Sequence, residues 1–133
     1  MVAGSMPSHD EAVALFERRR QAWLREDIDG YLGLWHPDCE FGSPMHQPPL
    51  RGRDAFAALV RQSNSAARPV RFDIRHLAVD GEVVLAEWDI GIAGRQDGRE
   101  VAWSGMSVCV IRDGLIVRWR EYWNPADLGL GRG

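Results

Sequence analysis

Apolar positions follow a helical period in the first part of the chain. Ser8 is followed three residues later by Glu11, which matches the capping box that begins many helices. Apolar residues then recur at helical spacing, and they predict a helix over about 9–26. These residues are Ala12, Val13, Leu15, Phe16, Ala22 and Trp23.

Two further helices are predicted downstream. Asp27 can cap a short second helix that ends before Pro37, because proline cannot continue a helix. Residues 39–42 then read as a short strand, and 43–52 as a proline-rich loop. A third amphipathic helix is expected over about 53–63.

The second half of the chain changes to an alternating pattern with a period of two. Asp-Gly pairs are strong hairpin-turn signals, and this half contains Asp80-Gly81, Asp97-Gly98 and Asp113-Gly114. They separate four predicted strands, near 70–79, 82–93, 100–112 and 115–123. Helices followed by a meander predict an α+β fold, with the helices on one face of an antiparallel sheet.

Length and composition predict one domain. The chain has 133 residues, of which 45% are hydrophobic and 26% charged, as in an ordinary globular protein. We expect a single domain over 9–128, a flexible N-terminal tail over 1–8 and a C-terminal tail over 129–133.

Charge and cysteine usage narrow the expected partners. The net charge is −3 and no wide stripe of Lys and Arg forms, so no nucleic-acid partner is expected. No apolar stretch approaches the ~20 residues of a membrane helix, and no secretory signal is visible. Cys39 and Cys109 fit no metal spacing. We read them as reduced, buried and structural, which predicts a cytoplasmic protein.

The last predicted strand contains an unusual carboxylate. Its apolar face is expected to point inward and consists of Leu115, Val117, Trp119, Glu121 and Trp123. Glu121 therefore lies between two tryptophans on a buried face. Burial raises the pKa of a carboxyl group and lets it exchange protons near neutral pH. The alternative is a glutamate that is satisfied by an inward Arg19 or Arg20.

The strand near 82–93 allows two interpretations. By polarity alone, Trp88 and Ile90 lie on the core face, while Glu87 and Asp89 lie on the solvent face. Alternatively, the apolar face packs on a partner subunit and the two carboxylates point into a pocket. Periodicity cannot choose between these interpretations.

Two histidines are further candidates for a binding site. His76 ends an apolar row that contains Phe72, where a satisfied core or rim histidine is the simpler interpretation. His46 lies in the proline-rich loop, at a pocket mouth or in solvent. The sequence contains no nucleophile elbow, phosphate loop or zinc pattern. We therefore expect neither a cofactor nor a metal.

Four stretches of the sequence together suggest a known family. They are 22–31 (AWLREDIDGY), 34–41 (LWHPDCEF), 52–55 (GRDA) and 112–123 (RDGLIVRWREYW). With these stretches the sequence resembles the SnoaL-like polyketide cyclase branch of the nuclear transport factor 2-like superfamily. This resemblance implies a cone-shaped α+β barrel, in which three N-terminal helices pack on a strongly curved, mostly antiparallel sheet. Superfamily members include isomerases, dehydratases, hydrolases, cyclases and non-enzymes, so the resemblance predicts fold better than function.

Ketosteroid isomerases of the superfamily fit this sequence poorly. The position of their general-base aspartate falls near Ser43, and that of their helical tyrosine falls near Arg19. Both residues that those enzymes use are therefore replaced.

The limonene-epoxide-hydrolase group fits better, with features of that group present in part. Its Arg-x-Asp matches Glu87-Trp88-Asp89, and its second aspartate matches Glu121. The carboxylate pair is kept, whereas Glu87 replaces the arginine. Phe41 and Ser43 stand where that group positions water with a tyrosine and an asparagine.

The polyketide cyclases close rings with an acidic residue in the last strand region, for which Glu121 is the counterpart. The resemblance also implies that Glu87 and Asp89 point into the pocket and that the back of the sheet forms a homodimer through Trp88, Ile90 and Ile92.

These observations predict a cofactor-independent enzyme that acts on a small hydrophobic molecule by general acid/base chemistry, as a cyclase, isomerase, dehydratase or epoxide hydrolase. Asp89 and Glu121 are the catalytic candidates. The predicted binding residues are Glu87, His46, His76, Phe72, Trp103, Trp119, Trp123, Phe41 and Ser43. The alternative is a non-catalytic module of the same fold that binds a small ligand or a protein partner.

Overall fold

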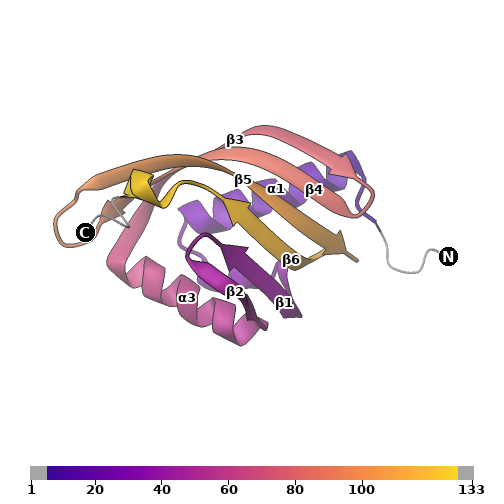
Figure 1. The fold of residues 1–133 in the computed structure, drawn as a ribbon, viewed down its shortest axis with the longest axis horizontal. Coiled ribbons are helices and arrows are strands. Elements are labelled where there is room, and N and C mark those ends of the chain that lie inside the picture. The colour runs from indigo at the N-terminus through magenta and orange to yellow at the C-terminus, as the bar shows by residue number, and fades with distance from the viewer. Residues whose placement is uncertain (1–5, 129–133) are drawn as a thin grey trace.

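The structure is a computed structural model that describes residues 6–128. Three helices lie on the inner side of one curved sheet (Figure 1). The helices are α1 (His9–Leu24), α2 (Ile28–Leu32) and α3 (Arg53–Ala66), followed near the C-terminus by the short 3-10 helix η1 (Pro125–Leu128). The strands are β1 (Trp35–Ser43), β2 (His46–Arg51), β3 (Ala67–Asp80), β4 (Val83–Gly94), β5 (Glu100–Arg112) and β6 (Leu115–Tyr122).

The six strands form one sheet in the order β2-β1-β6-β5-β4-β3. Every neighbouring pair is antiparallel except β1 and β6, which are parallel. The edges β2 and β3 do not meet, so the sheet is a strongly curved open cone. The predicted α+β cone fold is confirmed.

Most of the predicted helices and turns agree with the structure, but one strand was missed and another begins earlier than expected. The second helix was expected to include Trp35 and to end before Pro37, whereas α2 ends at Leu32 and Trp35 begins β1. The Ser8–Glu11 capping box begins α1. The Ser8 backbone N–H donates to the Glu11 side chain, and the Glu11 backbone N–H donates to the Ser8 hydroxyl, as expected. The expected loop over 43–52 instead contains β2. Its prolines argue against a central strand, but β2 lies at the sheet edge, where proline is tolerated.

Two β-bulges change which side chains face inward. On β3 the register shifts between Ile74 and His76, so the residues after the shift change faces. On β6, Ile116 pairs with Ile111 and is fully buried. The inward positions predicted for Leu115 and Val117 are therefore wrong, because the β5–β6 register is irregular at this point and Ile116 takes the inward place.

The core is dominated by three fully buried tryptophans, Trp35, Trp88 and Trp119. Trp88 donates its indole N–H to Ser107 Oγ at 3.2 Å. Its ring lies over Gly105, where an added Cβ would come within 2.7 Å of Trp88 Cη2 and 2.8 Å of the Tyr122 carbonyl oxygen. Glycine is therefore required for this close approach of ring and backbone.

Residues 1–5 and 129–133 lie outside the described part of the chain, so most of the predicted N-terminal tail and all of the C-terminal tail fall there. Within residues 6–128, no helix is both long and apolar enough to cross a membrane. Cys39 and Cys109 are buried and free, as expected.

We expect Gly105→Ala to lower the free energy of unfolding by about 1–3 kcal/mol, the usual cost of overpacking a core. Denaturant unfolding of both proteins measures the difference. Glu100→Ala is the control, because Glu100 is exposed at the start of β5 and its truncation is expected to change stability by less than about 0.5 kcal/mol. Equal stability of Gly105→Ala and wild type would show that the Trp88 ring can shift without cost.

Candidate functional site

A cavity of about 310 Å³ lies between the helices and the concave face of the sheet. Its wall is mostly aromatic and aliphatic, with few polar side chains. The apolar residues that line it include Trp23, Phe41, Phe56, Leu59, Phe72, Ile90, Ile92, Trp103 and Trp123. The main polar groups are Arg19, Tyr31, Ser43, His46 and Glu121. This composition suits a small hydrophobic molecule that is oriented by a few polar contacts.

Glu121 places a carboxyl group in this apolar cavity. It lies near the end of β6, opposite Ser107 of β5. Trp119 donates its indole N–H to Glu121 Oε2 at 3.3 Å. Burial raises the pKa of Glu121, while the attraction of Arg19 and hydrogen bonds from Trp119 and Trp123 oppose that rise. A buried carboxyl with a raised pKa can exchange a proton closer to neutral pH than an ordinary glutamate.

Arg19 is a buried cation at the base of the cavity. Only 5% of it is exposed, and its guanidinium stacks on Trp119 with its carbon 4.1 Å from the ring centroid. The Nη2 group donates to the Tyr31 hydroxyl at 3.1 Å. No ion pair joins Arg19 to Glu121 among the described residues, so Arg19 acts on that carboxyl through space rather than by direct contact.

Arg20, the other arginine considered as a partner of Glu121, is engaged elsewhere. It donates to the Phe72 carbonyl oxygen at 2.5 Å and pairs with Glu17 at 3.2 Å. The interpretation of Glu121 as a residue held directly by an arginine is therefore not supported by the contacts.

Ser43 and His46 form a second polar pair on the cavity wall. They face each other across the β1–β2 turn, with Ser43 Oγ 2.7 Å from His46 Nδ1. The Met45 backbone N–H also donates to Ser43 Oγ at 3.0 Å. Burial lowers the pKa of His46, which favours its neutral form, and a neutral imidazole can both accept and donate a proton.

The sheet topology brings this pair close to Glu121. Because β1 and β6 are parallel, Phe41 aligns with Trp119 and Gly42 with Arg120. Ser43 and Glu121 follow at the same end of the two strands. A second hollow, of about 380 Å³, is also lined by Ser43, His46 and Glu121. These three side chains thus border both spaces.

Asp89 does not converge on Glu121, which corrects the sequence-based expectation. It lies on the outer face of the sheet, where Arg75 Nε is 2.9 Å and Arg71 Nη2 3.8 Å from Asp89 Oδ2. Ser104 also donates to Asp89 Oδ1 at 2.5 Å. The physical reason is that β4 follows plain polarity, with apolar residues inward and charged residues outward.

The expected dimer residues lie in the core for the same reason. Trp88 and Ile90 are 1% and 8% exposed, and Ile90 and Ile92 line the cavity. They cannot form a contact on the back of the sheet, so the predicted dimer surface through these three residues is wrong.

Glu87 and His76 also lie outside the cavity. His76 Nδ1 is 2.9 Å from Glu87 Oε1 on the outer face, and the His76 side chain is 83% exposed. The β3 bulge before His76 moves it off the inward row that contains Phe72. Both were predicted as binding residues, and the structure contradicts that placement.

The remaining predicted binding residues lie at or next to the cavity. Phe41, Ser43, His46, Phe72, Trp103 and Trp123 line it. Trp119 is fully buried behind the lining and supports both Arg19 and Glu121. Their roles in binding stay predictions.

Sequence reasoning missed Arg19 as a cavity residue in its own right, together with Tyr31 and Phe56. A signal was present for Arg19. It continues the buried stripe of α1, formed by Ala12, Leu15 and Phe16, at helical spacing. Tyr31 and Phe56 come from α2 and α3, whose orientation over the sheet is a tertiary property.

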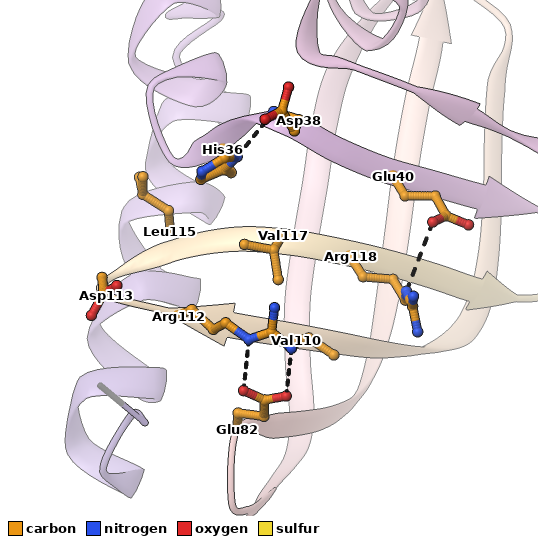
Figure 2. A pocket seen from close by; sticks show the side chains of 10 residues that line it. All are labelled: His36, Asp38, Glu40, Glu82, Val110, Arg112, Asp113, Leu115, Val117 and Arg118. Carbon is orange, nitrogen blue, oxygen red and sulfur yellow. Dashed lines mark hydrogen bonds and ion pairs between the residues drawn. The ribbon is translucent and has the colours of Figure 1, made fainter. Parts of the chain in front are cut away.

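A larger hollow, of about 590 Å³, lies on the outer face of the sheet (Figure 2). Four of the charged residues that line it form two ion pairs. Arg112 binds Glu82 through two hydrogen bonds of 2.8 and 2.9 Å, and Arg118 lies 3.9 Å from Glu40. Because these charges already have partners, the hollow offers less free binding capacity than the inner cavity.

Metal ligands do not gather in the described part of the chain. Among residues 6–128, no three His, Cys, Asp or Glu side chains lie close enough together to hold a metal ion.

Comparison with known protein families identifies the family of this chain. The chain belongs to the SnoaL-like domain family, whose pattern matches residues 16–119. The uncharacterized protein YesE of Bacillus subtilis (strain 168) is 27% identical over 111 residues, covering 77% of this chain and 74% of YesE.

Solved structures agree with this assignment. An LEH-like epoxide hydrolase from M. tuberculosis has a TM-score of 0.78 at 24% identity, covering 92% of this chain and 90% of that one. A proposed isomerase from Bacillus subtilis has a TM-score of 0.81 at 23% identity, covering 92% of each chain. A proposed polyketide cyclase from Xanthomonas campestris has a TM-score of 0.75 at 25% identity, covering 90% of this chain and 94% of that one. Such likenesses establish the fold.

The raised pKa of Glu121 predicts a pH-dependent stability. The folded state holds this proton more tightly than the unfolded chain, so the free energy of unfolding falls as pH rises from the ordinary value of 4.5 through the folded pKa. We expect Glu121→Gln to remove this decline. Urea unfolding between about pH 4 and 8 measures this decline, because the range begins near the ordinary pKa of a glutamate.

The matched control for this measurement is Glu100→Gln, because Glu100 is exposed. It should keep the decline seen in wild type. A Glu121→Gln protein that loses about 3–5 kcal/mol at every pH would instead identify Glu121 as a buried charge with an essential ionic partner.

Proposed function

We propose that this protein is a cofactor-independent enzyme that transfers protons to and from a small hydrophobic molecule, with Glu121 as the general acid/base. The observation that carries the proposal is the position of Glu121. It is a carboxyl group with a raised pKa at the wall of an apolar cavity of about 310 Å³. General acid/base groups work best when their pKa lies near the working pH.

The two-carboxylate mechanism is not part of this proposal, because Asp89 lies on the other face of the sheet. His46 is the candidate for the second proton-transfer group. It lines both hollows together with Glu121 and is favoured in its neutral form by burial.

The family relationship supports a proton-transfer reaction, but it does not indicate which reaction of this kind. Structural neighbours include a proposed isomerase, a proposed polyketide cyclase and an LEH-like epoxide hydrolase. Cyclisation, isomerisation and dehydration can each begin with removal of a proton next to a carbonyl. Epoxide opening needs a base to activate water.

The rival function is non-catalytic binding of a small ligand. A filled cavity with Glu121 held by an arginine would favour it. The cavity has room for a ligand, and the described residues contain no ion pair at Glu121, which favours the enzyme. The absence of Asp89 from the cavity removes one argument for the enzyme, so a direct test of proton transfer is required.

The test uses hydrogen–deuterium exchange at the α-carbon of 1-tetralone in D₂O, followed by NMR, together with hydrolysis of styrene oxide. We expect wild type to accelerate at least one of these reactions and Glu121→Gln to lose about 10²–10⁴-fold of the rate. The rate should rise with pH through the raised pKa of Glu121, because the ionised carboxylate is the base.

Asp89→Asn is the matched control, since Asp89 is a carboxylate on the outer face of the sheet. It should keep the wild-type rate. If wild type and Glu121→Gln give equal rates with both probes, Glu121 is not the acid/base and the binding module becomes the better hypothesis.

We still propose a homodimer through the back of the sheet, but through other residues than Trp88, Ile90 and Ile92. Met106 and Tyr122 are neighbours across β5 and β6, and both are large, exposed residues on the outer face. Sedimentation at tens of micromolar tests the assembly, and a monomer there would contradict it.

The buried free cysteines Cys39 and Cys109 support our proposal of a reducing compartment such as the cytoplasm.

A further inference from the structure

Three buried N–H groups on residues of the cavity wall have no hydrogen-bond partner among the described residues. They are Nε and Nη1 of Arg19 and the indole Nε1 of Trp103. Buried donors are normally satisfied, and a charged donor without a partner is especially costly. A fourth such group, the Trp35 indole N–H, lies away from this cavity, whereas Arg19 and Trp103 both line it, so one ligand could supply the acceptors for both residues.

The surroundings of Arg19 hold the cation in place and give it no direct ion-pair partner among the described residues. Trp119, Phe72 and Tyr31 surround the guanidinium, with its carbon 4.1, 5.2 and 5.3 Å from the three ring centroids. The Tyr31 hydroxyl accepts one hydrogen bond, which leaves most of the five guanidinium N–H donors available. No carboxylate of the described residues lies within ion-pair distance of Arg19.

We propose that the cavity binds a hydrophobic molecule bearing an anionic or enolisable oxygen, such as a carboxylate, a phenolate or a ketone, with that oxygen accepting hydrogen bonds from Arg19. The Trp103 indole N–H serves a second oxygen of the same molecule. The apolar rings of the wall enclose the hydrocarbon part.

This inference rests on the proposed function, because the catalytic role of Arg19 requires that Glu121 removes the proton. When ionised Glu121 takes a proton from the carbon next to a carbonyl, the C–H electron pair moves into a new C=C bond. The carbonyl π pair moves to oxygen, which becomes the enolate oxygen. Arg19 stabilises that negative charge, and protonated Glu121 can return the proton to another carbon.

The charged and titratable groups around Arg19 predict that an anionic ligand binds there less tightly as pH rises. Tyr31 from α2 and Cys109 from β5 both have a raised pKa, that of Cys109 at about 12, so both are neutral near pH 7. Glu121 from β6 is the group that ionises as pH rises, and His46 on β2 is favoured in its neutral form. Ionised Glu121 repels an anionic ligand, so affinity for an anion falls with rising pH.

The test compares 2-naphthoate with its neutral isostere 2-naphthamide by isothermal titration calorimetry. A charge-assisted hydrogen bond predicts that wild type binds naphthoate about 10- to 100-fold more tightly than naphthamide. Arg19→Met, which puts an apolar side chain into the aromatic cage, should lose this preference. Arg18→Gln is the matched control, because Arg18 is exposed on the same helix, and it should keep the preference.

Two further variants keep the test decisive if Arg19→Met fails to fold. Arg19→Lys retains the charge and should restore part of the preference. Trp103→Phe removes the indole N–H together with part of the ring, and it should weaken naphthoate binding by less than about 10-fold. Equal binding of the two probes to wild type, failure of naphthoate to bind, or a preference that survives in Arg19→Met would overturn the proposal.

Glu121→Gln separates this inference from the proposed function. We expect this variant to bind naphthoate with an affinity that no longer falls with pH, while it loses exchange of 1-tetralone. A naphthoate preference without any dependence of exchange on Glu121 would support the Arg19 site and contradict the acid/base role. Exchange that depends on Glu121 without a naphthoate preference would do the reverse.

Discussion

The stacking of the Arg19 guanidinium on Trp119 is the interaction on which the candidate site depends. It ties α1 to β6 and places a cation beneath an apolar cavity. Trp119 also donates to Glu121, so one indole organises both the buried cation and the buried carboxyl. Desolvation disfavours the ionised form of Glu121, whereas the cation favours it. Burial is the larger of these two effects, so the pKa of Glu121 lies above its ordinary value.

The sequence predicted the fold well because local signals agreed with one another. A capping box, helical spacing and Asp-Gly turns specified most helices and strands, and the inward position of Glu121 followed from its place between Trp119 and Trp123. Prediction failed where tertiary structure decided the outcome. A bulge on β3 turns the His76 side chain to the outer face of the sheet. The proline-containing β2 can form because it lies at the edge of the sheet. Neither feature has a reliable local signature.

Asp89 illustrates a different kind of error. Simple polarity indicated that it faces solvent, and the resemblance to epoxide hydrolases indicated the opposite. Its contacts with Arg75 and Ser104 show that polarity was the better guide. A family pattern can keep a residue type at a position while the residues that support its old role are replaced. Here Glu87 stands where that pattern has an arginine. The buried cation that lines the cavity is Arg19, which comes from α1.

The parallel pairing of β1 with β6 has a consequence for the order in which the protein folds. Phe41 and Trp119 are aligned partners although almost the whole sheet separates them along the chain. Contacts of such high sequence separation carry a large loop-closure entropy and tend to form after local hairpins. The β3–β4–β5–β6 meander can assemble from successive hairpins, whereas Ser43 meets Glu121 only once β1 has docked beside β6. We therefore expect the cavity to close late in folding, and it cannot be complete until β6 has been synthesised.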